Sequence, residues 1–317
     1  MNVFSIPLLT RFRGITVREG VLLEGAAGWG EFSPFLEYDA PTSAPWLDCA
    51  REAADLGWPA PLRDRVPVNV TVPACSPERA REIVLASSGC RTAKVKVVEP
   101  GQEPGEDEAR LEAVRDALGA DGLVRIDANG GWSVDEAVRR IGVLERAAGG
   151  LEYVEQPVAS VEDLALVRRR VSVPIAADES IRRAADPYRV RDLGAADIAV
   201  LKVQPLGGVR ACLRIAEDIG MPVVVSSAVE SSIGIAAGVA LAAALPSLPH
   251  ACGLATVQLL GGDVVAEPLL PVDGYLPVVR AVVDEALLAQ HAAAPDRVEH
   301  WRRRLAEVEG VRQGGRP

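Results

Sequence analysis

Short apolar runs alternate with amphipathic stretches along the chain from about residue 66 onward. The short runs are rich in β-branched residues, which is typical of strands buried in a parallel sheet. The longer stretches place apolar residues three or four positions apart, the spacing of a helix with one buried face. The predicted strands are VPVNVTV (66–72), TAKVKVV (92–98), LVRID (123–127), YVEQP (153–157), PIAAD (174–178), DIAVLKV (197–203) and PVVVSS (222–227), with a weaker eighth near 250–256.

A strand followed by a helix, repeated seven or eight times, predicts a parallel sheet of the α/β class. Closure of that sheet into a TIM-type (β/α) barrel across residues 66–262 is the most economical arrangement. An open doubly wound sheet is the alternative. No G-x-G-x-x-G motif follows the first predicted strand, so the usual dinucleotide signature of that alternative is missing.

Residues 1–65 lack this alternation. Residues 8–35 are expected to form strands joined by glycine-containing turns, followed by a helical stretch from about Ala44 to Leu56. These features predict a small α+β capping domain. We expect residues 263–317 to return to this cap, complete it and end in a flexible tail.

Composition narrows the class of protein. Lysine and arginine total 34 against 44 aspartate and glutamate, a net charge of −10 that opposes binding to nucleic acid or to anionic membranes. The five cysteines are scattered, which argues against disulfides or structural zinc. The longest apolar run, 233–245, is too short to span a bilayer, and the N-terminus lacks a signal-peptide pattern. We therefore expect a cytoplasmic protein; no pattern indicates its oligomeric state.

Charged residues recur at the carboxyl ends of the predicted strands, where the active site of a parallel barrel lies. Strand side chains alternate faces, so residues two apart point the same way, whereas the neighbours Asp178 and Glu179 should not both point inward. The candidate residues are Lys94 and Lys96, Asp127, Glu155, Asp178 and Lys202.

Three carboxylates gathered from separate strands repel one another unless a cation lies between them. Oxygen-only ligands favour Mg²⁺, with Mn²⁺ as a substitute, and such an ion could hold a small-molecule carboxylate substrate. A lysine could then remove the proton beside that carboxylate, because a second ammonium and the cation both lower its pKa. Helix caps are the structural alternative for single acids. A Schiff base at Lys202, as in class I aldolases, and a non-catalytic binding barrel are the functional alternatives.

The motifs resemble the muconate-lactonising subgroup of the enolase superfamily. They occur in the family's order across nearly the whole chain. The resemblance implies a modified (β/α)7β barrel in which Asp127, Glu155 and Asp178 ligate Mg²⁺. It also implies that Lys96 is the base, that Lys94 tunes it, and that Lys202 lies on the opposite face of the substrate. The matching motifs are K-V-K (94–96), D-A-N-G (127–130), E-Q-P (155–157), D-E-S (178–180) and K-V-Q-P-L-G-G (202–208).

Within this subgroup the chain is most similar to the dehydratases of menaquinone biosynthesis. That similarity implies syn elimination of water from 2-succinyl-6-hydroxy-2,4-cyclohexadiene-1-carboxylate by Lys96, with Lys202 stabilising an enediolate. It also implies that Ser226 and the backbone at Gly253 hold the succinyl tail, and that Arg125 supports the substrate pocket. The motifs are R-I-D-A-N-G (125–130), S-S-A-V-E-S-S-I-G (226–234) and A-C-G-L-A-T (251–256).

Two further expectations follow from the resemblance. The cap segment 28–34 is expected to close over the substrate. The region of the eighth strand lacks a D-x-D pair, which weakens a dipeptide epimerase interpretation. An N-acylamino acid racemase, or another racemase or epimerase of the subgroup, uses the same two lysines and stays as the alternative.

Overall fold

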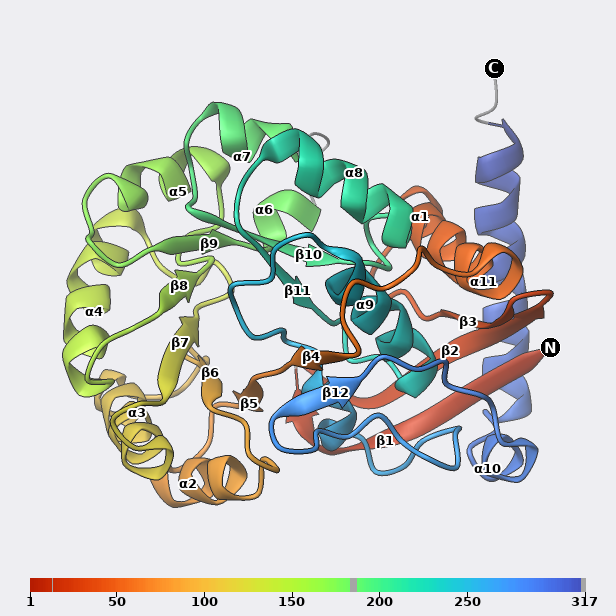
Figure 1. Ribbon diagram of the computed structural model, residues 1–317, viewed down its shortest axis with the longest axis horizontal. Helices are drawn as coiled ribbons and strands as arrows, with labels where there is room; N and C mark the ends of the chain where they lie inside the picture. The colour runs from red at the N-terminus through yellow and green to blue at the C-terminus, as the bar shows by residue number, and fades with distance from the viewer. Residues whose placement is uncertain (13, 183–186, 315–317) are drawn as a thin grey trace.

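The computed structural model describes residues 1–12, 14–182 and 187–314 (Figure 1). Seven parallel strands form one curled sheet in which each strand pairs with its neighbours in sequence. The strands are β5 (Val70–Val72), β6 (Thr92–Lys96), β7 (Leu123–Asp127), β8 (Tyr153–Glu155), β9 (Ile175–Ala177), β10 (Ile198–Lys202) and β11 (Val223–Ser226). This sequential parallel order confirms the predicted barrel and excludes the doubly wound alternative.

The gap between β11 and β5 is closed by a segment that is not a regular strand. Gly253 bridges to Ser226 and Cys252 bridges to Val68, both in parallel. The backbone N–H of Asn69 donates to the Cys252 carbonyl at 2.9 Å. The chain then turns into the 3-10 helix η2 (Ala255–Leu259). The expected eighth strand is thus reduced to two bridges, because the chain leaves the extended conformation soon after Gly253.

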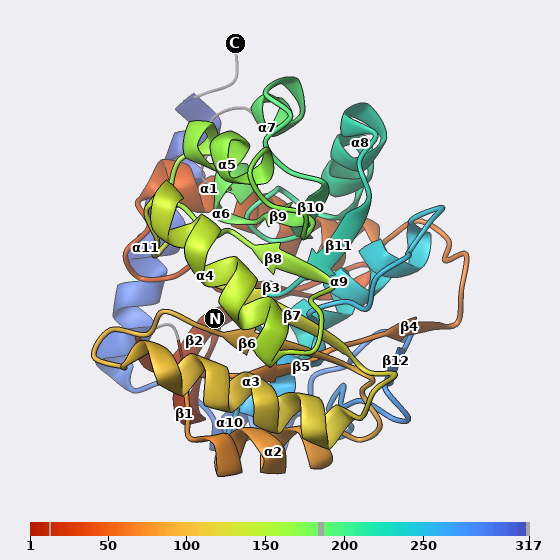
Figure 2. The same ribbon diagram turned by 90° about the vertical axis from the view of Figure 1, so that its left-hand side faces the viewer.

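Helices cover the outside of the sheet. In Figure 2 the helices α3 and α4 lie in front of β6 and β7. Ser76, Ser133, Ser160 and Ser231 each cap the helix that follows, accepting a backbone N–H with the side-chain oxygen. The helices are α2 (Pro77–Leu85), α3 (Pro104–Leu118), α4 (Val134–Ala147), α5 (Val161–Arg168), α6 (Glu179–Arg182), α7 (Tyr188–Asp192), α8 (Val209–Ile219) and α9 (Ser232–Ala244).

The helix α9 lies between the barrel and the cap (Figure 1). Its residues from Ser232 to Ala243 are all buried, as its uniformly apolar sequence predicts. No helix in the described part of the chain is long and apolar enough to cross a membrane.

The cap is an antiparallel sheet with helices packed against it. Trp301 meets Phe32 edge-on at 6.1 Å between ring centroids, and the Ala293 N–H donates to the Val3 carbonyl at 3.0 Å. The C-terminal helices therefore pack on the cap. The elements are β1 (Asn2–Phe12), β2 (Ile15–Gly25), β3 (Gly28–Phe32), α1 (Ala40–Arg51), the π-helix η1 (Glu52–Leu56), α10 (Glu285–Gln290) and α11 (Pro295–Gly314).

The boundaries at 65/66 and 262/263 stay a prediction. A two-stranded antiparallel ribbon joins the strand β4 (Arg65–Pro67) to β12 (Tyr275–Pro277), so part of the C-terminal segment also contacts the start of the barrel. Pro67 has no N–H to donate, which suits the end of the short strand β4. The helix α11 ends at Gly314, and residues 315–317 lie outside the described chain, so the flexible tail also stays a prediction.

Two buried carboxylates of the cap dock on the N-termini of consecutive barrel helices. Glu52 accepts from the Val209 N–H at 2.6 Å, at the start of α8. Glu31 accepts from the N–H groups of Ser231 and Gly234, each at 3.1 Å, at the start of α9. Helix N-termini carry unpaired N–H groups and partial positive charge, so both contacts are favourable. They fix the cap over the carboxyl ends of the barrel strands.

Candidate active site

A cavity of about 300 Å³ lies between the cap and the carboxyl ends of the barrel strands. Its lining comes from both parts of the chain and is strongly polar on the barrel side. The cap contributes Thr10, Arg11, Phe12, Gly14 and Phe35. The barrel contributes Thr71, Pro73, Ala74, Lys94, Lys96, Glu99, Asp127, Asn129, Asp178, Glu179, Lys202, Ser226, Ser227, Ala228, Val229, Gly253 and Thr256.

The register of the strands brings two of the three predicted carboxylates, Asp127 and Glu155, to one level, and Asp178 follows two residues further along at the same edge of the sheet. Lys96 pairs with Asp127 between β6 and β7, and Asp127 pairs with Glu155 between β7 and β8. Glu155 pairs with Ala176 between β8 and β9, two residues before Asp178. Because parallel strands end at the same edge, side chains that share a register share a height in the barrel.

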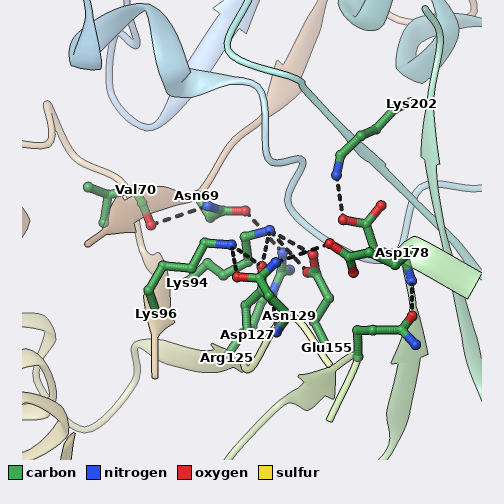
Figure 3. Close-up of polar contacts among 12 residues, drawn as sticks. Asn69, Val70, Lys94, Lys96, Arg125, Asp127, Asn129, Glu155, Asp178 and Lys202 are labelled. Carbon is green, nitrogen blue, oxygen red and sulfur yellow. Dashed lines mark hydrogen bonds and ion pairs between the residues drawn. The ribbon is translucent and has the colours of Figure 1, made fainter. Parts of the chain in front are cut away.

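Each carboxylate contacts a lysine ammonium (Figure 3). The Nζ of Lys94 lies 2.9 Å from Oε1 of Glu155 and 3.3 Å from Oδ2 of Asp127. The Nζ of Lys96 lies 2.5 Å from Oδ2 of the same Asp127. Lys202 contacts Asp178, and Figure 3 shows it approaching from a different side than Lys96. Lys96 and Lys202 thus flank Asp127 and Asp178 within one cavity, whereas Glu155 is buried behind its lining.

Burial and charge together set the ionisation of this cluster. Burial raises the pKa of Glu155 to about 7, and the charge of Asp127 adds to the rise. Burial alone would raise the pKa of Asp127, but the ammonium groups of Lys96 and Lys94 outweigh that effect and hold the pKa of Asp127 well below the usual range. Burial lowers the pKa of Lys94, but the negative charges of Glu155 and Asp127 outweigh this effect and raise it overall. The cluster therefore depends on positive charge to stay ionised.

The donor set fits a divalent cation in charge and in chemical type. Among the described residues, no group of three or more His, Cys, Asp or Glu side chains is already arranged around a metal position. The carboxylates instead contact the lysines. Three buried carboxylates at one edge need positive charge, and oxygen-only donors are those that Mg²⁺ prefers. The residues are thus suited to a hard cation once the lysines release them.

Comparison with known proteins places this geometry in a family. Residues 3–54 match the family described as enolase N-terminal domain-like, and residues 77–282 match the family described as enolase C-terminal domain-like. An o-succinylbenzoate synthase from Thermobifida fusca (strain YX) is 67% identical over 305 residues, which cover 96% of this chain and 94% of that protein. This chain belongs to the o-succinylbenzoate synthases of the enolase superfamily. The o-succinylbenzoate synthase from Mycolicibacterium smegmatis (strain ATCC 700084 / mc(2)155) is 58% identical, with coverages of 95% and 92%.

Solved structures agree with the fold of this o-succinylbenzoate synthase family member. The muconate lactonizing enzyme from Pseudomonas fluorescens superposes with a TM-score of 0.78 at 23% identity, covering 92% of this chain and 97% of that one. A dipeptide epimerase from Enterococcus faecalis V583, in complex with Mg and the dipeptide L-Leu-L-Tyr, gives 0.74 at 24% identity, covering 89% and 96%. Enzymes of the enolase superfamily generally depend on Mg²⁺.

The substrate-pocket residues expected from the o-succinylbenzoate synthase resemblance are only partly at the cavity. Ser226 and Gly253 line it side by side, and a Cβ added at Gly253 would lie 2.6 Å from Oγ of Ser226. Arg125 does not line it. Its guanidinium is fully buried deeper in the barrel and donates to Glu152 at 2.6 Å and to the Ala251 carbonyl at 2.7 Å. Direct contact of Arg125 with substrate therefore has no support in the geometry.

The expectation that only one of Asp178 and Glu179 faces the site is wrong. Both residues line the cavity. Asp178 contacts Lys202, whereas Glu179 accepts from the Asn129 amide at 3.1 Å. Strand parity did not apply, because β9 ends at Ala177 and α6 begins at Glu179.

The cap residues that face the cavity are not those expected. None of residues 28–34 lines it, whereas Thr10, Phe12 and Phe35 do. The ring centroid of Phe12 lies 5.6 Å from Nζ of Lys96, within the range of a cation–π contact. In the sequence, the one feature that could have pointed to Phe12 as a cavity residue is that it is an aromatic residue at the end of the first predicted strand of the cap, close to Gly14.

Proposed function

We propose that this chain, like its family, catalyses the Mg²⁺-dependent syn dehydration of 2-succinyl-6-hydroxy-2,4-cyclohexadiene-1-carboxylate to 2-succinylbenzoate, a step of menaquinone biosynthesis. The observation that carries the proposal is one cavity lined by Asp127 and Asp178 together with Lys96 and Lys202. The third carboxylate, Glu155, is buried and contacts Lys94 in the cavity wall. Identities of 67% and 58% over nearly the full length with two o-succinylbenzoate synthases support it.

Lys96 would act first as a base and then as an acid. Its neutral amine takes the proton from C1, the carbon beside the carboxylate, and the electron pair moves into that carboxylate to form an enediolate. The resulting ammonium then protonates the hydroxyl that leaves C6 as water, and the ring becomes aromatic. One lysine can carry out both proton transfers because, in a syn elimination, the proton that is removed and the hydroxyl that leaves lie on the same face of the ring.

The remaining charged residues would stabilise the enediolate. Asp127, Glu155 and Asp178 would hold Mg²⁺, which when bound supplies positive charge where the negative charge develops. Lys202 would face the ring from the other side as a fixed cation. Lys94, bonded to Glu155 at 2.9 Å, would keep positive charge beside Lys96 and so favour its neutral amine.

The succinyl tail would lie against Ser226 and the backbone at Gly253, which adjoin one another in the cavity wall. Arg125 would act indirectly. It donates to the Ala251 carbonyl, two residues before Gly253, and so supports the segment that closes the barrel.

The direct assay follows the loss of the cyclohexadiene absorbance when the purified protein meets this substrate. We expect turnover with Mg²⁺ or Mn²⁺ and none in excess EDTA. Absence of turnover with either metal would overturn the proposal.

Racemisation of an N-acylamino acid is the second candidate, because Lys96 and Lys202 lie on different sides of one cavity. Two-base racemisation needs that arrangement, whereas dehydration needs only one proton-transferring lysine. Exchange of the α-proton with deuterated solvent, measured for both enantiomers, tests it. No exchange with any acylated amino acid would remove this candidate.

The Schiff-base alternative for Lys202 makes a different prediction. Borohydride would trap a covalent adduct between Lys202 and a carbonyl substrate. Membership of the enolase superfamily predicts no adduct and activity that depends on the metal.

A further inference from the structure

The loop after β11 holds a strained residue in the wall of the cavity. Val229 lines the cavity and has a φ of 63°. A β-branched residue rarely adopts this left-handed conformation, since its side chain crowds the backbone there. Such a conformation persists only where the surrounding structure holds it.

Two side chains hold the backbone on either side of Val229. The Nε of Arg18, in β2 of the cap, donates to the Val229 carbonyl at 3.0 Å. The carboxylate of Glu230 accepts from the Ala228 N–H at 2.7 Å. Both side chains are buried, with Arg18 3% and Glu230 1% exposed, so water does not compete for these bonds.

The same guanidinium reaches a second part of the cavity wall. It lies 4.8 Å from the ring centroid of Phe35, which lines the cavity from the cap side. Its Nη2 donates to Oγ of Ser33 at 2.9 Å and also contacts the Ser33 carbonyl. Arg18 itself does not line the cavity. It therefore touches one wall residue from the barrel and one from the cap.

Neighbouring charges keep Arg18 in this place. The positive charge of Arg18 stabilises the ionised forms of two buried side chains, Glu31 and Glu230. The hydroxyl of Ser33, which Arg18 also contacts, donates to Glu31 at 2.6 Å. Two donors of one planar guanidinium, Nε and Nη2, reach Val229 and Ser33 while the guanidinium carbon lies over the Phe35 ring. The ammonium of a lysine cannot reproduce that geometry.

We propose that Arg18 is a positioning residue that holds Val229 in its left-handed conformation and Phe35 against the same cavity, and thereby sets the fit of the substrate. This inference rests on the proposed dehydratase function for the identity of the substrate. Arg18 acts through the two wall residues and contacts no reacting atom. Its loss should therefore weaken substrate binding more than the chemical step.

The first test does not depend on turnover. Hydrogen exchange of the backbone at 226–231, measured by mass spectrometry, should become at least about tenfold faster in Arg18→Met, because a lost charge-assisted hydrogen bond contributes more than about 1.4 kcal/mol. Arg297→Met is the matched control, since Arg297 pairs with Glu19 within the cap and does not line the cavity. Equal exchange in wild-type protein and Arg18→Met would overturn the proposal, whether or not the wild-type protein dehydrates the substrate.

The second test uses kinetics. Arg18→Met should raise KM about tenfold while kcat stays within about threefold, and Arg297→Met should leave KM within about twofold. In a Val229→Asn background the effect of Arg18→Met on KM should shrink to about threefold or less, because asparagine adopts the left-handed conformation readily. An unchanged effect of Arg18→Met in that background would contradict the proposal. If Arg18→Met does not fold, Arg18→Lys replaces it, with the same direction expected in both tests.

Discussion

The Nζ of Lys96 lies 2.5 Å from Oδ2 of Asp127, so the proposed base is bonded to a proposed metal ligand. Asn129 accepts a second hydrogen bond from Lys96 at 2.8 Å. The lysine must leave Asp127 before it can take a proton from the substrate. A cation that binds Asp127 would compete for the same oxygen and thus release the amine, which couples metal binding to activation of the base.

Replacement of a proposed ligand should weaken metal binding without unfolding the protein. For Asp178→Asn we expect the Kd for Mg²⁺, measured by titration calorimetry, to rise at least about tenfold, because a carboxylate charge is lost from the site. Activity should fall in parallel and recover in part at high Mg²⁺. Replacement of the exposed Asp135 by asparagine serves as the control, and an unaltered Kd in Asp178→Asn would rule out that residue as a ligand.

The contact between cap and barrel at Gly208 should tolerate no side chain. Gly208 has a φ of 108°, and a Cβ there would lie 2.0 Å from Oε2 of Glu52. We expect Gly208→Ala to lower the free energy of unfolding by about 2–4 kcal/mol in urea titrations. In Gly310→Ala, where no atom lies within 4 Å of the added Cβ, unfolding should become less favourable by up to about 1 kcal/mol. Equal effects of the two substitutions would contradict the docking described above.

The buried Glu31 should make stability depend on pH. Burial, together with the like charge of Glu230, raises the pKa of Glu31 from its usual 4.5 to about 7, although Arg18 opposes the rise. Between these values the folded protein keeps a proton that the unfolded chain has released, so stability falls as pH rises. The thermal midpoint of wild-type protein should therefore decline relative to that of Glu31→Gln from about pH 5 to about pH 8. A difference between the two midpoints that does not change with pH would show that Glu31 is ionised throughout.

Much of the barrel follows from local sequence. Apolar runs separated by helical stretches mark β6 to β11, and the charged residues at the ends of the runs for β6 to β10 mark the catalytic edge. Strand alternation also places Lys94 and Lys96 correctly on one face. This part is predictable because side-chain direction in a strand depends only on neighbouring residues.

The errors concern features that depend on distant contacts. The parity argument for Glu179 failed because the strand ended one residue earlier than its apolar pattern suggested. Phe12 and Phe35 face the cavity only because of the way the cap docks on the barrel. That docking is fixed by contacts of Glu52 and Glu31 with the helices α8 and α9, which lie far along the chain. The left-handed Val229 has no local signature, since its partner Arg18 lies 211 residues away.

The comparison of wild-type protein with Lys96→Ala tests the central claim, that one lysine beside three carboxylates transfers the protons of the dehydration. With Mg²⁺ and the cyclohexadiene substrate, we expect kcat to fall at least about 10³-fold, within the range for loss of a general acid–base group, while circular dichroism and the thermal midpoint show a folded protein. A folded Lys96→Ala protein with near-normal kcat would contradict the claim.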